Sequence, residues 1–189
     1  MQILRDSKLP KILAERTVAR SHIFQIDEVD LCFSNGVQCT YERSTSRSLT
    51  SVMVVPMLNA DTVLLIREYA VGVDRYELTL PKGVIDAGEA PLAAANRELQ
   101  EEVGYGAKCL TFLKEMTAIP GYLTGSMHCI VAEDLYLATL QGDEPEALEV
   151  VAYPLADLAT LVMDNTMTEA RTIAALYMTR DYLAGRLHL

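Results

Sequence analysis

Three glutamates near the middle of the chain have a spacing that could support chemistry. Glu98, Glu101 and Glu102 stand at positions i, i+3 and i+4, which share one face of a helix. On an exposed helix each like-charge pair costs about 0.2–0.5 kcal/mol. Partly buried carboxylates about 5.5 Å apart repel by about 3 kcal/mol at an effective dielectric constant of about 20. A hard divalent cation such as Mg²⁺ prefers oxygen ligands and commonly bridges to phosphate. The stripe therefore indicates either metal-assisted phosphate chemistry or a solvated acidic face.

The helix that would carry this stripe is predicted from Pro91 to Val103. Proline suits the first turn of a helix, and Gly104 suits the position just past its end. Arg97 stands within reach of Glu89 on the preceding loop and of Glu101 one turn along. It could therefore hold either carboxylate in position.

The residues around this helix extend the pattern over positions 83–105. Gly83 is followed after five residues by Glu89, and after seven more by the run R-E-L-Q-E-E-V-G. This resembles the Nudix box, Gly-x5-Glu-x7-Arg-Glu-U-x-Glu-Glu-x-Gly-U, in which U is aliphatic. Every fixed residue is present. The single departure is Tyr105 at the last aliphatic place, which is a packing position.

The resemblance to the Nudix family implies a fold and a reaction. The implied fold is α+β, a Nudix α/β/α sandwich with a mixed sheet. The implied reaction is hydrolysis of a nucleoside diphosphate linked to another group X, by a pyrophosphatase that acts on phosphoric anhydrides. The implied cofactor is Mg²⁺, with Mn²⁺ as an alternative and one to three ions per site.

The same resemblance assigns roles by position in the box. The metal ligands it implies are Glu98, Glu101 and Glu102, with an oxygen from the backbone carbonyl of Lys82 or Gly83. The residues it implies as supports of these ligands are Gly83, Glu89 and Arg97.

The flanking sequence is similar to that of ADP-ribose pyrophosphatases within the family. That similarity implies substrate contacts for Arg67 and Glu77, which precede the box. Pro120 lies 15 residues past Tyr105, as in ADP-sugar enzymes, and Tyr122 lies 17 past it, as in dinucleoside polyphosphate enzymes. The whole chain resembles bacterial members that act on ADP-ribose, diadenosine triphosphate and NADH, releasing AMP and X-phosphate.

A general base is also needed to activate water. In ADP-ribose pyrophosphatases it often comes from an acidic loop after the box, and the matching stretch here is Gly142-Asp143-Glu144-Pro145-Glu146. We expect Glu146 first and Glu144 second in this role. A box glutamate, Glu101 or Glu102, is the alternative, and any one residue of the loop could simply be solvated.

Two other functions remain open at this point. The chain could be a Nudix hydrolase of other nucleotide sugars, dinucleoside polyphosphates or a capped RNA end, and Pro81-Lys82-Gly83 looks more like the polyphosphate enzymes. It could also be a sensing domain that binds nucleotide without cleaving it. Such domains usually lose box carboxylates, and this chain keeps all of them.

The residues before the box predict a small antiparallel sheet with a hairpin at Ser34-Asn35-Gly36. A two-residue loop would mix apolar and polar side chains on each face. A three-residue loop, with Gly36 in the left-handed region, pairs Leu31 with Cys39 and Val29 with Tyr41. We prefer this register because it gathers apolar side chains on one face.

The polar run at 43–50 is predicted to be a linker between two domains. Residues 1–46 would form the N-terminal β-sheet region, and residues 47–189 the Nudix hydrolase domain. A sheet this small is not stable alone. By analogy with the ADP-ribose group, we expect a homodimer in which this region contacts the partner and helps enclose the substrate.

Composition limits the partners of the chain. Its 189 residues include 16 Lys and Arg against 26 Asp and Glu, for a net charge of −10. Such a chain is a poor match for nucleic acid and would be repelled by an anionic membrane. No apolar run approaches the ~18 residues that cross a bilayer, and no signal peptide is recognisable. We expect a cytoplasmic protein with a small ADP-containing substrate and no nucleic-acid or membrane partner.

Overall fold

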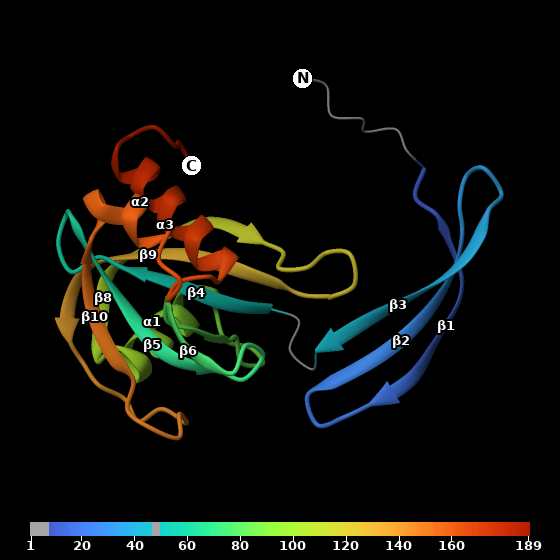
Figure 1. Ribbon diagram of the computed structural model, residues 1–189, viewed down its shortest axis with the longest axis horizontal. Helices are drawn as coiled ribbons and strands as arrows, with labels where there is room; N and C mark the ends of the chain where they lie inside the picture. The colour runs from blue at the N-terminus through green and yellow to red at the C-terminus, as the bar shows by residue number, and fades with distance from the viewer. Residues whose placement is uncertain (1–7, 47–49) are drawn as a thin grey trace. The chain divides into compact units, whose positions relative to one another are not determined.

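The computed structural model describes residues 8–46 and 50–189 and shows a mixed α+β architecture (Figure 1). The chain forms two compact units. One holds the described residues 8–46 together with Thr117–Gly125, and the other holds Thr50–Met116 and Ser126–Leu189. The short segment 117–125 thus groups with the N-terminal residues, although the sequence assigned it to the larger domain.

The N-terminal unit contains the small antiparallel sheet that the sequence predicted. Its strands are β1 (Lys11–Arg20), β2 (Phe24–Cys32) and β3 (Gln38–Ser46), in the order β1-β2-β3. The predicted hairpin register is confirmed, since Leu31 lies opposite Cys39 and Gly36 has a φ of +84°.

The predicted linker is wrong over its first residues, because β3 continues through Ser46 and pairs with Phe24. One polar side chain of this stretch, Thr45, bonds across the sheet to Asp27. Asp27, only 3% exposed, accepts hydrogen bonds from the hydroxyls of Thr17 at 2.7 Å and Thr45 at 3.2 Å. The bond from Thr17, with others from Gln25 and Thr45, lowers the pKa of Asp27 despite its burial. Residues 47–49 lie outside the described part of the chain.

The larger unit contains two sheets and the helices that cover them. One sheet is mixed, with the order β7-β4-β9-β8 and a parallel pairing between β4 and β9. The other is antiparallel, with the order β10-β5-β6. The strands are β4 (Thr50–Pro56), β5 (Thr62–Ala70), β6 (Arg75–Thr79), β7 (Lys82–Val84), β8 (Tyr105–Met116), β9 (Ser126–Leu137) and β10 (Glu149–Pro154). The helices are α1 (Pro91–Glu102), α2 (Leu158–Leu161), which follows a 3-10 turn at Leu155–Asp157, and α3 (Ala170–Leu183).

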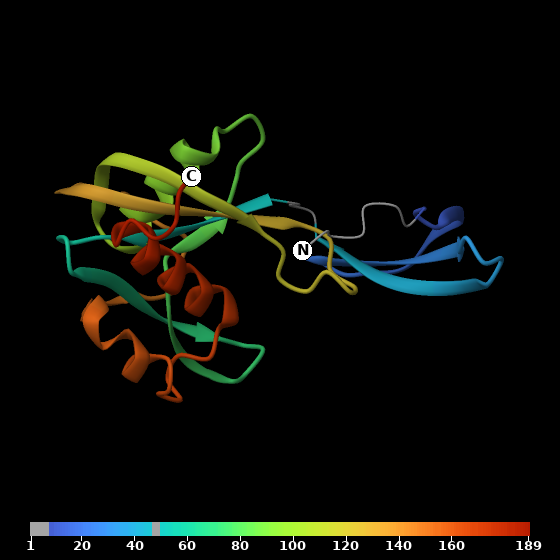
Figure 2. The same cartoon turned by 90° about the horizontal axis from the view of Figure 1, so that it is seen from above.

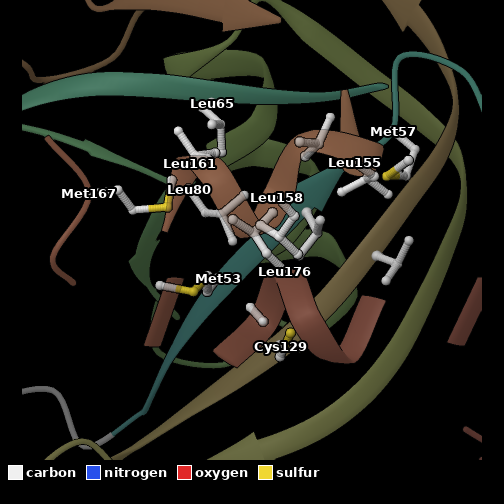
Figure 3. Packing of buried hydrophobic residues seen from close by; sticks show 14 of the residues in the cluster. Met53, Met57, Leu65, Leu80, Cys129, Leu155, Leu158, Leu161, Met167 and Leu176 are labelled. Carbon is white, nitrogen blue, oxygen red and sulfur yellow. The ribbon is translucent and has the colours of Figure 1, made fainter. Parts of the chain in front are cut away.

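Strand β4 separates two apolar layers. Val52 and Val54 pack in one cluster with Leu99 of α1. Met53 of the same strand packs in a second cluster with Leu176 of α3 (Figure 3). Helix α3, red in Figure 2, therefore covers the face of the sheet opposite to α1. This confirms the α/β/α sandwich, and in the described part of the chain no helix is long and apolar enough to span a membrane.

We predict that Leu176→Ala lowers the free energy of unfolding by about 2–5 kcal/mol, because it leaves a cavity in a fully buried cluster. Urea denaturation followed by circular dichroism measures this change. The matched control is Leu137→Ala, since Leu137 is 80% exposed and its truncation should change stability by no more than about 0.5 kcal/mol. Equal effects of the two variants would contradict the packing described.

Candidate active site

Helix α1 holds the three glutamates because its opposite face is fixed against the sheet. Ala94, Ala95 and Leu99 are fully buried in the cluster shared with β4 and β9. The helix begins at Pro91 and ends at Glu102, close to its predicted bounds. With the apolar face fixed, the glutamate face cannot turn away from the space in front of it.

That space is a cavity of about 670 Å³ within the larger unit. Glu98, Glu101 and Glu102 all line it. They are joined there by residues of β7 and by the loop that follows β9, including Lys82 and Glu144. The structure thus brings the predicted metal ligands and part of the predicted base loop to one cavity.

Arg97 organises the carboxylates around it. Its Nε and Nη2 donate to the two oxygens of Glu89 at 3.0 and 2.9 Å. Its Nη1 donates to Glu98 at 2.7 Å and to Glu101 at 3.1 Å, and its Nη2 also donates to the carbonyl of Val84 at 2.9 Å. The sequence left Glu89 and Glu101 as alternative partners of Arg97. The structure shows that Arg97 bonds to both of them, and to Glu98 in addition. Hydrogen bonding to Arg97 is the main cause that lowers the pKa of Glu89.

Gly83 allows β7 and α1 to approach closely. A Cβ atom at this position would lie 2.0 Å from Cδ of Glu98, so the Glu98 side chain would have to move. Any larger residue at position 83 would therefore displace the Glu98 carboxylate.

Burial makes this carboxylate cluster costly to ionise. Glu98 is only 7% exposed. Burial raises its pKa, and the charges of Glu101 and Asp143 add to this rise, although the hydrogen bond and charge of Arg97 oppose it. Burial also raises the pKa of Glu102 to about 8, although the nearby charge of Lys82 and a 3.0 Å bond from the Lys82 backbone N–H oppose this shift. Added positive charge would relieve both residues.

The donor set fits a hard divalent cation in its chemistry. Carboxylate oxygens are the ligands such ions prefer, and these carboxylates resist ionisation where they stand. In the described part of the chain, however, no three acidic, histidine or cysteine side chains already converge on one point. Arg97 holds Glu98 and Glu101, while the Lys82 N–H holds Glu102. Bringing the carboxylates onto one ion would require these side chains to turn.

The two loop glutamates expected as bases have different surroundings. Glu144 lines the cavity, and its pKa is raised by burial first and then by the charges of Glu68 and Asp143. Glu146 is not among the residues that line the cavity. Its carboxylate accepts a 2.5 Å hydrogen bond from the hydroxyl of Tyr76 on β6.

Arg67 and Glu77, the expected substrate contacts on β5 and β6, do not line this cavity. Nε of Arg67 donates to Glu149 on the paired strand β10 at 2.9 Å. Glu77 is 5% exposed and accepts bonds from the Thr168 N–H at 2.9 Å and from Nε of Arg75 at 2.6 Å. Burial is the largest single influence on the pKa of Glu77, but the bonds from Thr168 and Arg75 together outweigh it and lower that pKa.

Pro120 and Tyr122 belong to the other unit. They line an apolar cavity of about 410 Å³ there, together with β2 and β3 residues such as Leu31 and Tyr41. The backbone of Ser44 fixes this segment, donating to the carbonyl of Tyr122 at 2.7 Å. Tyr122 remains 59% exposed.

Sequence reasoning missed Glu68, whose carboxylate pairs with Nζ of Lys82. It also missed Tyr76 as the partner of Glu146. The signal for Glu68 was an acidic residue two positions past the buried run Val63–Ile66 of β5. Nothing in the local sequence signals the bond of Tyr76, because its partner lies 70 residues away.

Comparison with known proteins places the chain in a family. Residues 10–43 match the NudE-type Nudix hydrolase N-terminal domain, and residues 47–176 match the NUDIX domain. The chain is 50% identical over 177 residues to the ADP compounds hydrolase NudE of Escherichia coli, covering 94% of this chain and 95% of that protein. It is 28% identical to an ADP-ribose pyrophosphatase of Bacillus subtilis over 88% of this chain and 92% of that protein.

A solved structure agrees with these sequence matches. A crystal structure of an ADP compounds hydrolase superposes with a TM-score of 0.90 at 48% identity, covering 97% of this chain and 100% of that one. The chain belongs to the Nudix hydrolase family, which confirms the expectation of an enzyme of this kind.

We predict that Glu102→Gln stabilises the metal-free protein at alkaline pH. Glu102 has a pKa of about 8 in the folded state, above the ordinary value, so the wild type loses stability as pH rises from about 4.5 towards 8. The glutamine variant lacks this loss. Its free energy of unfolding should exceed that of the wild type by about 1–3 kcal/mol at pH 9, with little difference at pH 4.5.

Urea denaturation in EDTA at both pH values measures the difference. The matched control is Glu115→Gln, on an exposed position of β8, which should show no such pH dependence. A Glu102→Gln variant less stable than the wild type at pH 9 would show that the carboxylate is not under electrostatic strain.

Proposed function

We propose that the chain hydrolyses the pyrophosphate bond of ADP compounds, namely ADP-ribose, diadenosine triphosphate and NADH. Water is consumed, and AMP and X-phosphate are released. The observation that carries this proposal is the set of box glutamates, organised by Arg97, which shares one cavity with the acidic loop after β9. The names of the relatives, an ADP compounds hydrolase and an ADP-ribose pyrophosphatase, support the substrate class.

Glu98, Glu101, Glu102 and the backbone carbonyl of Lys82 would hold Mg²⁺ or Mn²⁺, one to three ions per site. When bound, such ions neutralise phosphate oxygens and lower the pKa of water. The chain's own residues prepare the site. Arg97 fixes the direction of the box carboxylates, and Gly83 leaves the space that Glu98 occupies.

Among the candidate bases, the surroundings favour Glu144 over Glu146, which reverses the order expected from sequence. A base that works near neutral pH needs a raised pKa and access to the reacting water. Glu144 lines the cavity and has its pKa raised by burial. Glu146 is held by Tyr76 and does not line the cavity. Glu101 and Glu102 remain the alternatives if they are not fully engaged as ligands.

Arg67 and Tyr122 are the substrate contacts that the structure supports best. Arg67 has a partly exposed guanidinium, for which the described residues show one ion pair, with Glu149, so a phosphate could replace its partner. Tyr122 offers an exposed ring in an apolar cavity suited to stacking on adenine, with Pro120 beside it. Glu77 is engaged in bonds to Thr168, which favours a positioning role over direct contact.

The N-terminal unit supports a homodimer. All ten residues of β1 are exposed, and apolar side chains such as Ile12 and Phe24 are 60% and 51% exposed. A surface of this kind is typical of an interaction site. We propose that residues 1–46 mediate dimerisation and help enclose the substrate, that residues 47–189 form the hydrolase domain, and that the enzyme works in the cytoplasm without nucleic-acid or membrane partners.

We predict that the protein with ADP-ribose and Mg²⁺ yields AMP and ribose 5-phosphate in equal amounts, measured by ion-exchange chromatography. Loss of a positioned base costs about 10²–10⁴-fold in rate, so Glu144→Gln should fall in this range. Glu102→Gln should lose turnover at least as severely while staying folded. Glu146→Gln should lose less than about tenfold, a change under 1.4 kcal/mol in the barrier.

The control for these variants is Glu115→Gln, which should keep wild-type turnover. Release of AMP from none of the three ADP compounds would leave only a nucleotide-binding role. A larger loss from Glu146→Gln than from Glu144→Gln would restore the order expected from the sequence.

We predict that the wild type has about twice the 20.9 kDa chain mass in light scattering at micromolar concentration. Ile12→Glu should shift it towards the monomer, because it buries a charge in the apolar interface. Lys11→Glu on the same exposed strand is the control, since it adds negative charge without removing apolar surface. A monomeric wild type would contradict the proposed dimer.

A further inference from the structure

Lys82 is a second basic side chain, beside Arg97, in the acidic cavity. Arg97 is committed to three glutamates and one carbonyl, so its charge is already used. Lys82 instead makes one side-chain ion pair that the structure shows, from Nζ to the carboxylate of Glu68. Its ammonium is thus the more available positive charge in a site that must receive a polyanion.

The backbone of Lys82 is fixed although its side chain is long. Its N–H donates to Glu102 at 3.0 Å, and it pairs with Met53 in the register of β7 and β4. Four methylene groups separate this anchored backbone from the ammonium. The ammonium can therefore change partners while the rest of the residue stays in place.

The resting partner of the ammonium can be displaced. Glu68 and Lys82 have side chains that are 28% and 20% exposed, and Lys82 lines the cavity, so a competing anion can reach the ion pair. Glu68 carries one negative charge, whereas a pyrophosphate bridge carries more and presents several oxygens. Lys82 lines the same cavity as Glu102 and Glu144, and its charge lowers the pKa of both against the burial that raises it.

We propose that Lys82 is a substrate-binding residue whose ammonium leaves Glu68 and binds the phosphate bridge of the ADP compound. Glu68 holds the ammonium in the empty site and keeps it directed into the cavity. This inference rests on the proposed function. It adds a residue whose ammonium changes its partner from the Glu68 carboxylate to a substrate phosphate. It gives Glu68, which follows the buried part of β5, a role in the site.

The test compares Lys82→Met, Glu68→Gln and the double variant in steady-state hydrolysis of ADP-ribose with saturating Mg²⁺. Lys82→Met should raise KM about tenfold, the effect of about 1.4 kcal/mol for one lost charge-assisted hydrogen bond, with a smaller change in kcat. Glu68→Gln should leave KM at or below the wild-type value, because it frees the ammonium. The double variant should keep the raised KM of Lys82→Met.

The double variant separates binding from simple neutralisation. If Lys82 only balances the charge of Glu68, removing both charges together should restore the wild-type KM, and that result overturns the inference. An unchanged KM in Lys82→Met, or a raised KM in Glu68→Gln, overturns it as well.

A second measurement follows the metal instead of turnover. Lys82→Met keeps its backbone carbonyl, so Mg²⁺ binding measured by calorimetry should be no weaker than in the wild type, whereas weaker binding would point to a lost metal site and overturn the inference. Lys108→Met, on an exposed position of β8, is the matched control and should keep the wild-type KM. If the wild type itself releases no AMP, the proposed function fails; if it does and Lys82→Met is unaffected, only this inference fails.

Discussion

The site depends on the repulsion between carboxylates that the fold prevents from moving apart. Burial of Ala94, Ala95 and Leu99 fixes the rotation of α1, so Glu98 and Glu102 must share one cavity. Their raised pKa values show that the protein alone does not balance this charge. A loss of folding stability of this kind is common at functional sites, where charged groups are held in place for a ligand. The anionic substrate then requires positive charge at the same point. The uncompensated negative charge that destabilises the free protein also favours binding of cations there.

Two features keep this strain from disrupting the helix. Arg97 lies between Glu89, Glu98 and Glu101 and connects the helix to the loop before it. Gly83 allows the β7 backbone to pass close to Glu98 without a side chain between them. The first feature depends on the second, because the guanidinium can hold Glu98 in place only where the strand leaves room for its carboxylate.

Local patterns in the sequence predicted much of this arrangement. Helical spacing and end signals predicted α1 nearly to its bounds, and the pairing of apolar side chains predicted the β2–β3 register. The continuation of β3 was not predictable in the same way, because its Thr45 hydroxyl bonds to Asp27 across the sheet and not to a neighbour in sequence. The grouping of residues 117–125 with the N-terminal unit likewise depends on backbone bonds to Ser44.

The two loop glutamates show where sequence reasoning reaches its limit. Glu144 and Glu146 stand two residues apart, and their types and spacing cannot rank them. The difference comes from the fold, since burial and then the charge of Glu68 raise the pKa of Glu144, while Tyr76 binds Glu146. Glu68 is thus placed to act on a loop carboxylate and on Lys82 together. A phosphate that takes the ammonium from Glu68 would leave that carboxylate with an uncompensated charge near Glu144. Because like charges raise the pKa of a carboxyl group, substrate binding at Lys82 would make Glu144 a stronger acceptor for a proton from water.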